Sequence, residues 1–183
     1  KRENTPRVVA LHYRGDSAKD KKDLTHEQAA LICKKIEGLG ASVLLIDWRD
    51  ESPLAMDGWK YDCGARTTGK MPQSLDWGKD AEMNCAVISQ CAAFVGIDSG
   101  PAKCASATDT PALVVWTRHH PAPFHDPAPN TTHLVPRGFH GMDPVGNAPG
   151  VVAWFNRHYK VRQYDDSDPV REIGNWLEEV FKK

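Results

Sequence analysis

The sequence lacks the glycine-rich and nucleophile motifs that mark several common enzyme classes. Its 183 residues contain no GxGxxG fingerprint and no GxxxxGK[ST] loop, which argues against a dinucleotide-dependent dehydrogenase and a P-loop NTPase. The GxSxG elbow of α/β-hydrolases is also missing. No apolar run approaches the ~20 residues of a membrane span, and no signal peptide is visible. We therefore expect a cytoplasmic chain without a membrane span, for which contact with a membrane surface stays open.

An excess of charge of one sign is missing too. Lysine and arginine total 23, aspartate and glutamate total 24, and the formal net charge is −1. A chain this close to neutrality has no overall basic field to attract nucleic acid. We therefore expect no nucleic-acid partner, although local basic clusters stay compatible with smaller anions.

Cysteine is sparse and has no recognisable spacing. There are five cysteines, an odd number, and no CxxC pair. Four of them lie among apolar or small residues of expected helices: Cys33, Cys85, Cys91 and Cys104. We interpret these as reduced core residues rather than as a disulfide or zinc framework, and we expect no metal site.

The chain also lacks an initial methionine and begins Lys-Arg-Glu-Asn. A length of 183 residues suits one domain with a substantial core. We expect residues 1–183 to form a single domain that is a piece of a longer polypeptide.

What the sequence does contain is an alternation of short apolar runs with helical patterns. Four runs predict buried strands: residues 7–12 (RVVALH), 42–47, 94–98 and 112–116. Helical patterns cover residues 25–38, 80–92 and 101–108, and a last helix begins at Asp168-Pro169. This order predicts an α/β fold with an open, parallel, Rossmann-like sheet flanked by helices.

Two stretches have little periodicity. Residues 48–78 hold several glycines and do not decide between a short strand and a lid. Residues 117–150 are rich in proline, glycine and histidine, and we expect a long loop there, of the kind that is usually functional or mobile.

The segment "VGIDSGPAKCASA", residues 95–107, carries the strongest candidate site. Gly100 allows close approach of a ligand, and Pro101 suits the first position of a helix. Ser99 can act as N-cap or as a phosphate ligand, and the amides of Ala102 and Lys103 can face an anion. The residues alone leave two interpretations equally open, a capped strand-to-helix turn and an anion site.

Polar residues follow the other expected strands. Lys19, Lys21 and Lys22 come after the first strand, where a lysine can neutralise a diphosphate; a solvated loop is the alternative. After the second strand, Asp47, Asp50 and Glu51 suit either ribose binding or a solvated loop. Because carboxyl ends of parallel strands share one edge, we expect these groups to converge.

The stretch "RHHPAPFHD", residues 118–126, holds three histidines and an aspartate. His119 and His120 are adjacent, and the prolines of this stretch restrict the loop in a way that does not suit a zinc site, so we expect Arg118 and these histidines to face phosphate or sugar. Asn130-Thr131-Thr132 matches a glycosylation sequon, which carries little weight without a secretory signal.

Two stretches of the sequence resemble a known family. "FVGIDSGPAKCASATDTPALVVWTRHHP" resembles the stretch "VVGNDSGPMHLAAALGTPTVALFGPTDP" of heptosyltransferase-like glycosyltransferases, the ADP-heptose:lipopolysaccharide heptosyltransferase family. Upstream, "KDLTHEQAALICKKIEGLGASVLLI" is similar to that family's "KRWPPERFAELARRLAELGYRVVLL". The resemblance covers roughly residues 7–121.

The resemblance implies a GT-B architecture, of which this chain would be the C-terminal, donor-binding lobe. The acceptor lobe with the usual catalytic base would then be missing from the chain, so no catalytic residue is assigned. The residues implied for the donor diphosphate are Lys22, Asp98, Ser99, Gly100, Pro101, Ala102 and Lys103. Asp50 or Glu51 would lie near the ribose, and further sugar or phosphate contacts would come from Arg14, Ser17, Arg118 and His119.

Two departures bear on the donor. The family usually has histidine where this chain has Lys103, and its "GPTDP" appears here as "TRHHP", residues 117–121. Both changes indicate a more basic pocket.

The resemblance therefore implies transfer of a heptose or hexose from a nucleotide diphosphate sugar, with ADP favoured, to a hydroxyl acceptor such as lipopolysaccharide. No metal or other cofactor is expected. The alternatives are a nucleotide-sugar epimerase of the same architecture and a non-catalytic module that binds a nucleotide sugar or a protein.

Overall fold

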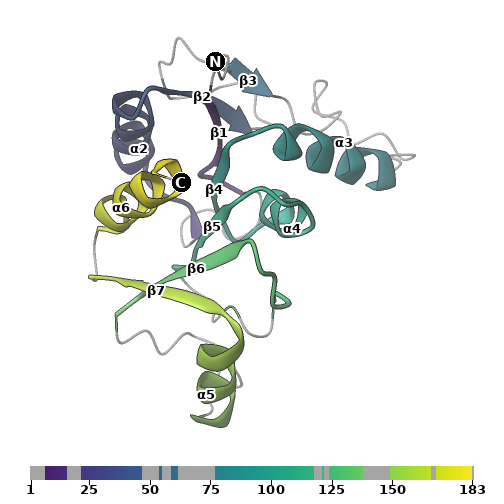
Figure 1. Cartoon of the computed structure of the whole chain (residues 1–183), viewed down its shortest axis with the longest axis vertical. Helices are drawn as coiled ribbons and strands as arrows, with labels where there is room; N and C mark the ends of the chain where they lie inside the picture. The colour runs from purple at the N-terminus through teal and green to yellow at the C-terminus, as the bar shows by residue number, and fades with distance from the viewer. Residues whose placement is uncertain are drawn as a thin grey trace.

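The computed structural model shows one parallel sheet of seven strands with helices on both faces (Figure 1). The structure describes residues 7–15, 22–46, 54, 59–61, 77–117, 121, 124–137, 149–165 and 168–182. The strands are β1 (Arg7–His12), β2 (Ala41–Ile46), β3 (Trp59–Tyr61), β4 (Ala93–Ile97), β5 (Ala112–Val115), β6 (Thr131–Pro136) and β7 (Lys160–Tyr164). The helices are α2 (His26–Gly38), α3 (Trp77–Ser89), α4 (Gly100–Ser106), α5 (Pro149–His158) and α6 (Pro169–Phe181).

The strand order is β3-β2-β1-β4-β5-β6-β7. From β1 the chain builds outward through β2 to β3, and then returns to place β4 on the other side of β1. All neighbouring strands are paired in parallel. The order therefore reverses between β1 and β4, which is the topological switch point of an open α/β sheet.

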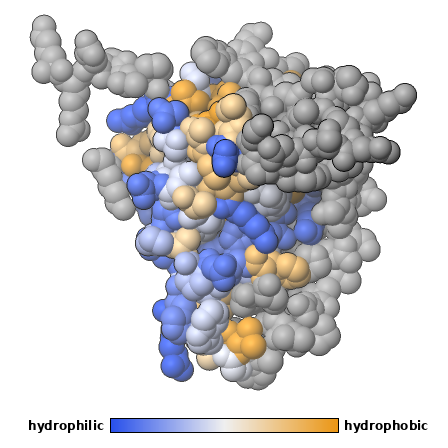
Figure 2. All heavy atoms as spheres, turned by 90° about the vertical axis from the view of Figure 1, so that its right-hand side faces the viewer, coloured by the Kyte–Doolittle hydropathy of each residue, from blue (hydrophilic) through white to orange (hydrophobic). Residues whose placement is uncertain are grey.

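Each face of the sheet has its own apolar core. Helices α2 and α6 cover one face, where Ile32, Ile36, Ile173 and Leu177 pack against alternate strand residues. Helices α3 and α4 lie on the other face, over a smaller cluster that includes Phe94, Val114 and Trp116. On the outer surface of that second side, hydrophilic residues are interspersed with small hydrophobic groups (Figure 2).

Local sequence explains where the helices begin and how one of them ends. The Thr25 hydroxyl accepts from the Gln28 amide, and the Gln28 side chain accepts from the Thr25 amide, so the predicted capping box is confirmed. Gly40, with φ +71, supplies the left-handed conformation that turns the chain from α2 into β2. Asp168 caps α6 through the Val170 amide, as its place before Pro169 predicted.

The fold class and the four predicted strands are confirmed, with boundaries shifted by at most one residue. The predicted helix over residues 80–92 begins and ends three residues earlier. The expected long loop over residues 117–150 is wrong in part, because β6 lies inside it and α5 begins at its end. Strand β7 was also not predicted.

The cysteines of the described residues carry free thiols, and Cys33 is buried in the core under α2. Burial raises the pKa of the Cys33 and Cys91 thiols to about 11, so both stay protonated at neutral pH. Among the described residues, no helix is both long enough and apolar enough to cross a membrane.

Candidate functional site

The carboxyl ends of β1 and β4 bring the two predicted phosphate-binding segments together. Residues 13–15 follow β1 and residues 98–100 follow β4, on either side of the switch point. Ligands of open α/β sheets bind in the crevice outside this point. The fold therefore places the Asp-Ser-Gly-Pro segment where a ligand is expected on topological grounds alone.

An ion pair spans the switch point. The Lys22 ammonium lies 3.1 Å from Oδ2 of Asp98, and the side chains are only 16% and 11% exposed. An ammonium has three N–H donors, of which Asp98 takes one. Lys22 is therefore held in place by Asp98 and retains donors for a further oxygen ligand.

The backbone around Lys22 is fixed to two strand ends. The Leu24 amide donates to the Tyr13 carbonyl at 2.9 Å, and the Gly15 amide donates to Oδ1 of Asp23 at 2.8 Å. On the other side, the Thr117 hydroxyl after β5 donates to the Lys22 carbonyl at 3.3 Å. The Lys22 ammonium thus belongs to a segment that is hydrogen-bonded to the ends of β1 and β5. Ligand binding should therefore cost little conformational entropy for this segment.

The turn before α4 differs in two details from the sequence prediction. Ser99 occupies the N-cap position but makes no cap hydrogen bond, because its hydroxyl donates to the Ile97 carbonyl at 3.1 Å. The Lys103 amide donates to the Ser99 carbonyl at 3.3 Å, so it is used inside the helix rather than facing an anion. The backbone amides of Gly100 and Ala102 lie in the first turn of α4 and therefore have no carbonyl acceptor within the helix. They are available to donate to a ligand.

Helix α4 has only seven residues, fewer than two full turns. Its dipole is correspondingly small, so side-chain charge has to supply most of the attraction for an anion. Lys103 is exposed, and no described carboxylate lies within ion-pair distance of its ammonium. With Lys22 and Asp98 neutralising each other, Lys103 gives this cluster a net charge of about +1.

Gly100 has no structural need to be glycine. Its φ is not positive, and a Cβ built on it would meet no atom within 4 Å. The position beside Asp98 and Ser99 is therefore open on the side where a side chain would project. This agrees with the sequence argument that glycine here serves the approach of a ligand rather than the turn itself.

A residue that was not assigned individually from the sequence lies at the same edge. His125 is 5% exposed, and its Nε2 has no hydrogen-bond partner among the described residues. Its ring packs edge-on against Trp116 and His133, with centroids 5.5 and 5.4 Å apart. Burial lowers the pKa of His125 below 6.5, while the charges of Asp98 and Lys103 act in opposite directions on it.

Of the other predicted site residues, Arg14 lies at the end of β1 and is buried, with its guanidinium 5.5 Å from the Tyr13 ring centroid. The remaining ones fall outside the described residues: Ser17, Lys19, Lys21, Asp47, Asp50, Glu51, Arg118, His119 and His120. In the part of the chain that the structure describes, no three histidine, cysteine, aspartate or glutamate side chains are grouped as metal ligands.

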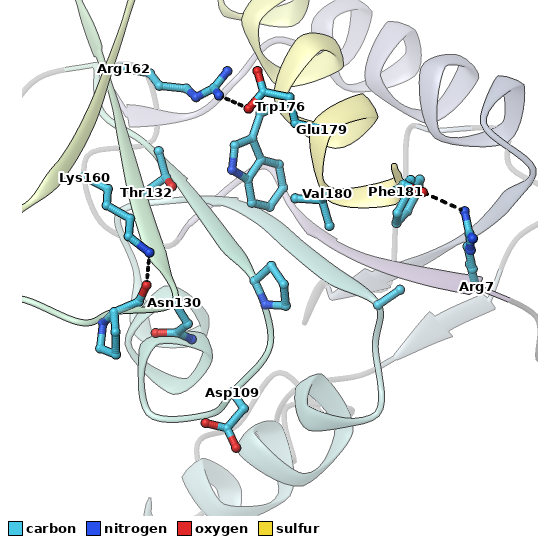
Figure 3. A pocket seen from close by; sticks show the side chains of 13 residues that line it. Arg7, Asp109, Asn130, Thr132, Lys160, Arg162, Trp176, Glu179, Val180 and Phe181 are labelled. Atoms are coloured by element: carbon cyan, nitrogen blue, oxygen red, sulfur yellow. Dashed lines mark hydrogen bonds and ion pairs between the residues drawn. The ribbon is translucent and has the colours of Figure 1, made fainter. Parts of the chain in front are cut away.

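A cavity of about 670 Å³ lies at the opposite, amino-terminal edge of the sheet (Figure 3). Its charged groups are largely engaged within the protein. Arg162 pairs with Glu179, Lys160 donates to the Pro129 carbonyl, and Arg7 donates to the Phe181 carbonyl at 3.5 Å. The cavity therefore lies away from the predicted site, and most of its cations have partners already.

Asn130, also at the amino-terminal edge, has a structural role. Its side-chain amide donates to the carbonyls of Ala105, Thr108 and Thr110 at 2.7–2.9 Å. These bonds fix the connection between α4 and β5 to the start of β6. The sequon at this position is thus occupied by an asparagine that is half-buried and fully engaged.

Comparisons with known proteins give one informative likeness. No protein-family model matches the sequence, and the curated proteins contain no matching relative. The structure of a family 9 glycosyl transferase from Veillonella parvula superposes with a TM-score of 0.62 at 13% identity, covering 97% of this chain and 46% of that one.

Two heptosyltransferase structures superpose less well. E. coli WaaC with ADP gives a TM-score of 0.48 at 15% identity, covering 95% of this chain and 44% of that one. The dodecameric iron-containing TibC, in complex with ADP-D-β-D-heptose, gives 0.43 at 18% identity, covering 69% and 31%. The chain thus spans less than half the length of each of these proteins. The Veillonella structure shows that this chain has the α/β fold of about half of that glycosyl transferase.

Proposed function

We propose that the chain is the donor-binding lobe of a GT-B glycosyltransferase, which transfers a sugar from a nucleotide diphosphate sugar to a hydroxyl acceptor. The observation that carries the proposal is the ion pair between Lys22 and Asp98. It joins the two segments that resemble the family, 76 residues apart, at the switch point of the sheet. An ADP-linked heptose or hexose is the favoured donor because of that resemblance.

The chemistry of the leaving group explains the residues. In the transfer, the bond between the anomeric carbon and the diphosphate oxygen breaks, and the electron pair stays with the diphosphate. Lys22, Lys103 and the free amides of Gly100 and Ala102 would stabilise the charge that develops there without a metal ion. The acceptor hydroxyl oxygen would form the new bond to the anomeric carbon and lose its proton to a base outside these 183 residues, and the acceptor would bind to a second lobe of the GT-B architecture.

Asp98 would act as a positioning residue in this scheme. A carboxylate repels phosphate, so its presence in an anion site needs a reason. Its bond to Lys22 holds the ammonium at the crevice in the absence of ligand, and the pair is only slightly exposed. Replacing Asp98 by Asn should remove a negative charge that repels phosphate, but it should also break the ion pair that holds the Lys22 ammonium in place.

Thermal-shift measurements with ADP-, UDP-, GDP- and CDP-glucose test the proposal on the 183-residue chain. The best of these ligands should raise the melting temperature, and calorimetry should then show at least tenfold weaker binding to Lys22→Ala, since a charge-assisted hydrogen bond contributes about 1.5–3 kcal/mol. Lys34→Ala, an exposed lysine on α2, is the matched control and should bind as the wild type. Equal affinity of wild type and Lys22→Ala would refute the site, and the absence of any shift would refute nucleotide binding.

A further inference from the structure

The observation that leads beyond this scheme is the buried imidazole of His125. Nearly all buried polar atoms in proteins have a hydrogen-bond partner, and an exception calls for an explanation. His125 is 5% exposed, and its Nε2 has no partner among the described residues. Its position is nevertheless well fixed, so the missing partner does not reflect a loosely held side chain.

Contacts on several sides hold the residue. The His125 amide donates to the Pro121 carbonyl at 2.9 Å, and the hydroxyl of Tyr159, which directly follows α5, donates to the His125 carbonyl. Its ring lies edge-on to the rings of Trp116 and His133. The indole of Trp116 in turn donates to Nδ1 of His133 at 3.0 Å, which fixes the surface that the His125 ring packs against.

The same contacts place His125 beside the carboxyl edge of the sheet. Trp116 directly follows β5, and its neighbour Thr117 bonds to the Lys22 carbonyl. The charges of Asp98, in the turn after β4, and Lys103, on α4, both act on the imidazole, together with Asp126 of its own segment. His125 thus shares its electrostatic surroundings with the proposed diphosphate site, although it comes from a different segment of the chain.

We propose that His125 is a ligand-binding residue of that site, whose Nε2–H donates a hydrogen bond to a diphosphate oxygen of the bound nucleotide sugar. The inference rests on the proposed function. The phosphate oxygens of a diphosphate diester carry no hydrogen at neutral pH, so the imidazole has to be the donor. The Lys22 and Lys103 ammonium groups of the site favour an anion over a neutral hydroxyl.

The bond has a consequence for pH dependence. Burial keeps the pKa of unliganded His125 below 6.5, and a phosphoryl oxygen accepting from Nε2 favours the protonated ring and raises that pKa on binding. Affinity should therefore rise as the pH falls from 8 to 6. The titratable and charged groups around the ring are Asp98, Lys103, Asp126, His133 and Tyr159.

Two substitutions separate binding from packing. His125→Phe keeps a ring between Trp116 and His133 but removes both nitrogens, whereas His125→Gln keeps an N–H near the position of Nε2. With ADP-glucose as probe, which has no phosphate group titrating between pH 6 and 8, calorimetry should show five- to tenfold weaker binding to His125→Phe. His125→Gln should recover part of the affinity, and neither variant should show the rise in affinity at pH 6.

The melting temperature without ligand distinguishes a binding role of His125 from a purely structural one. Because His125→Phe removes a buried unpaired nitrogen, it should melt at or above the wild-type temperature while binding more weakly. If either variant fails to fold, the ring ¹⁵N resonances of wild-type His125 replace the comparison, and they should move when ADP-glucose is added.

The failures can be told apart. If Lys22→Ala weakens ADP-glucose binding but His125→Phe binds within twofold of the wild type, the role of His125 is wrong and the proposed function stands. Unmoved ring resonances at saturating ADP-glucose have the same meaning. If the wild type binds no nucleotide sugar at all, both proposals fail.

Discussion

The two edges of the sheet differ in how far their charged and polar side chains are already bonded within the protein. The amino-terminal edge has a cavity of about 670 Å³, but the cations Arg7, Lys160 and Arg162 bond to neighbouring groups of the protein. At the carboxyl-terminal edge, and counting only the residues that the structure describes, Lys103 has no ion-pair partner and the buried Nε2 of His125 has no hydrogen-bond partner. A buried polar group without a partner calls for an explanation, and this is why we place the proposed ligand site at the carboxyl-terminal edge.

The two edges also differ in the hydrogen bonds that hold their connecting segments in place. Asn130 bonds three carbonyls at the amino-terminal edge and so closes the connections between elements there. At the carboxyl-terminal edge, the Asp23 carboxylate accepts from the Gly15 amide and the Thr117 hydroxyl donates to the Lys22 carbonyl, which helps to hold the segment around Lys22. We therefore expect substitutions at the first edge to change stability, and those at the second to change affinity.

The largest effect is expected at the amino-terminal edge, for Asn130→Ala. All three carbonyls would lose the Asn130 side-chain donor, which should lower the free energy of unfolding by about 2 kcal/mol or more. Urea denaturation measures this loss, and Asn175→Ala, an exposed asparagine on α6, is the control. A variant as stable as the wild type would show that water replaces these bonds at no cost.

The next effect belongs to the carboxyl-terminal edge, for Lys103→Ala. Removing the surplus charge should weaken nucleotide-sugar binding by about fivefold at low salt, or roughly 1 kcal/mol, because the side chain is exposed and screened. Lys160→Ala, at the other edge, should bind normally. Calorimetry at two salt concentrations decides, and equal losses in the two variants would remove the distinction between the edges.

A smaller effect concerns the stability of the unliganded chain at low pH. The folded-state pKa of His125 lies below 6.5, so between these values the unfolded chain binds a proton that the folded chain does not. The free energy of unfolding should therefore be at its full value above pH 6.5 and decrease as the pH falls toward the folded pKa, by at most about 1.4 kcal/mol per pH unit. In His125→Phe the decrease from pH 7.5 to pH 5.5 should be smaller, and an identical decrease would assign the effect to other groups.

The smallest effects are expected for Gly100→Ala, and they should have opposite signs. The free energy of unfolding should rise by about 0.5 kcal/mol, because alanine restricts the unfolded chain and meets no atom in the folded one. Nucleotide-sugar affinity should fall about threefold, or roughly 0.6 kcal/mol, if a ligand approaches this backbone. Gly38→Ala, where a Cβ also meets nothing, should leave the affinity unchanged, and unchanged affinity at Gly100 would argue against close approach there.

Sequence reasoning succeeded where local chemistry decides the structure. The run RVVALH is apolar enough to be buried, and β1 covers the same six residues. The caps at Thr25 and Asp168 are formed by neighbouring residues, so their spacing was sufficient to predict them. The family resemblance implied Lys22 and Asp98 for one diphosphate site; the structure pairs the two side chains at 3.1 Å, and their role in binding stays a prediction.

It failed where distant partners make a polar residue acceptable in the core. Strand β6, with the sequence TTHLVP, was taken for loop because it lies in a stretch rich in proline, glycine and histidine with little periodicity, yet its polar residues Thr131 and His133 are buried. Thr131 bonds to Ser106 and His133 accepts from Trp116, and neither partner is near in sequence. The environment of His125 could not be predicted for the same reason, because it depends on His133 of β6 and on Tyr159, which lies between α5 and β7, and β6 and β7 were not predicted.

The contacts that hold Lys22 also make the proposed ligand binding dependent on folding of distant parts of the chain. Its ammonium meets Asp98 after β4, and its carbonyl meets Thr117 after β5, so the site needs segments spread over 95 residues. Such contacts are formed late, since closing long loops is slow. The appearance of nucleotide-sugar binding during refolding should therefore report the moment at which β4 and β5 have joined β1, and the ligand itself can serve as a clock for assembly of the sheet.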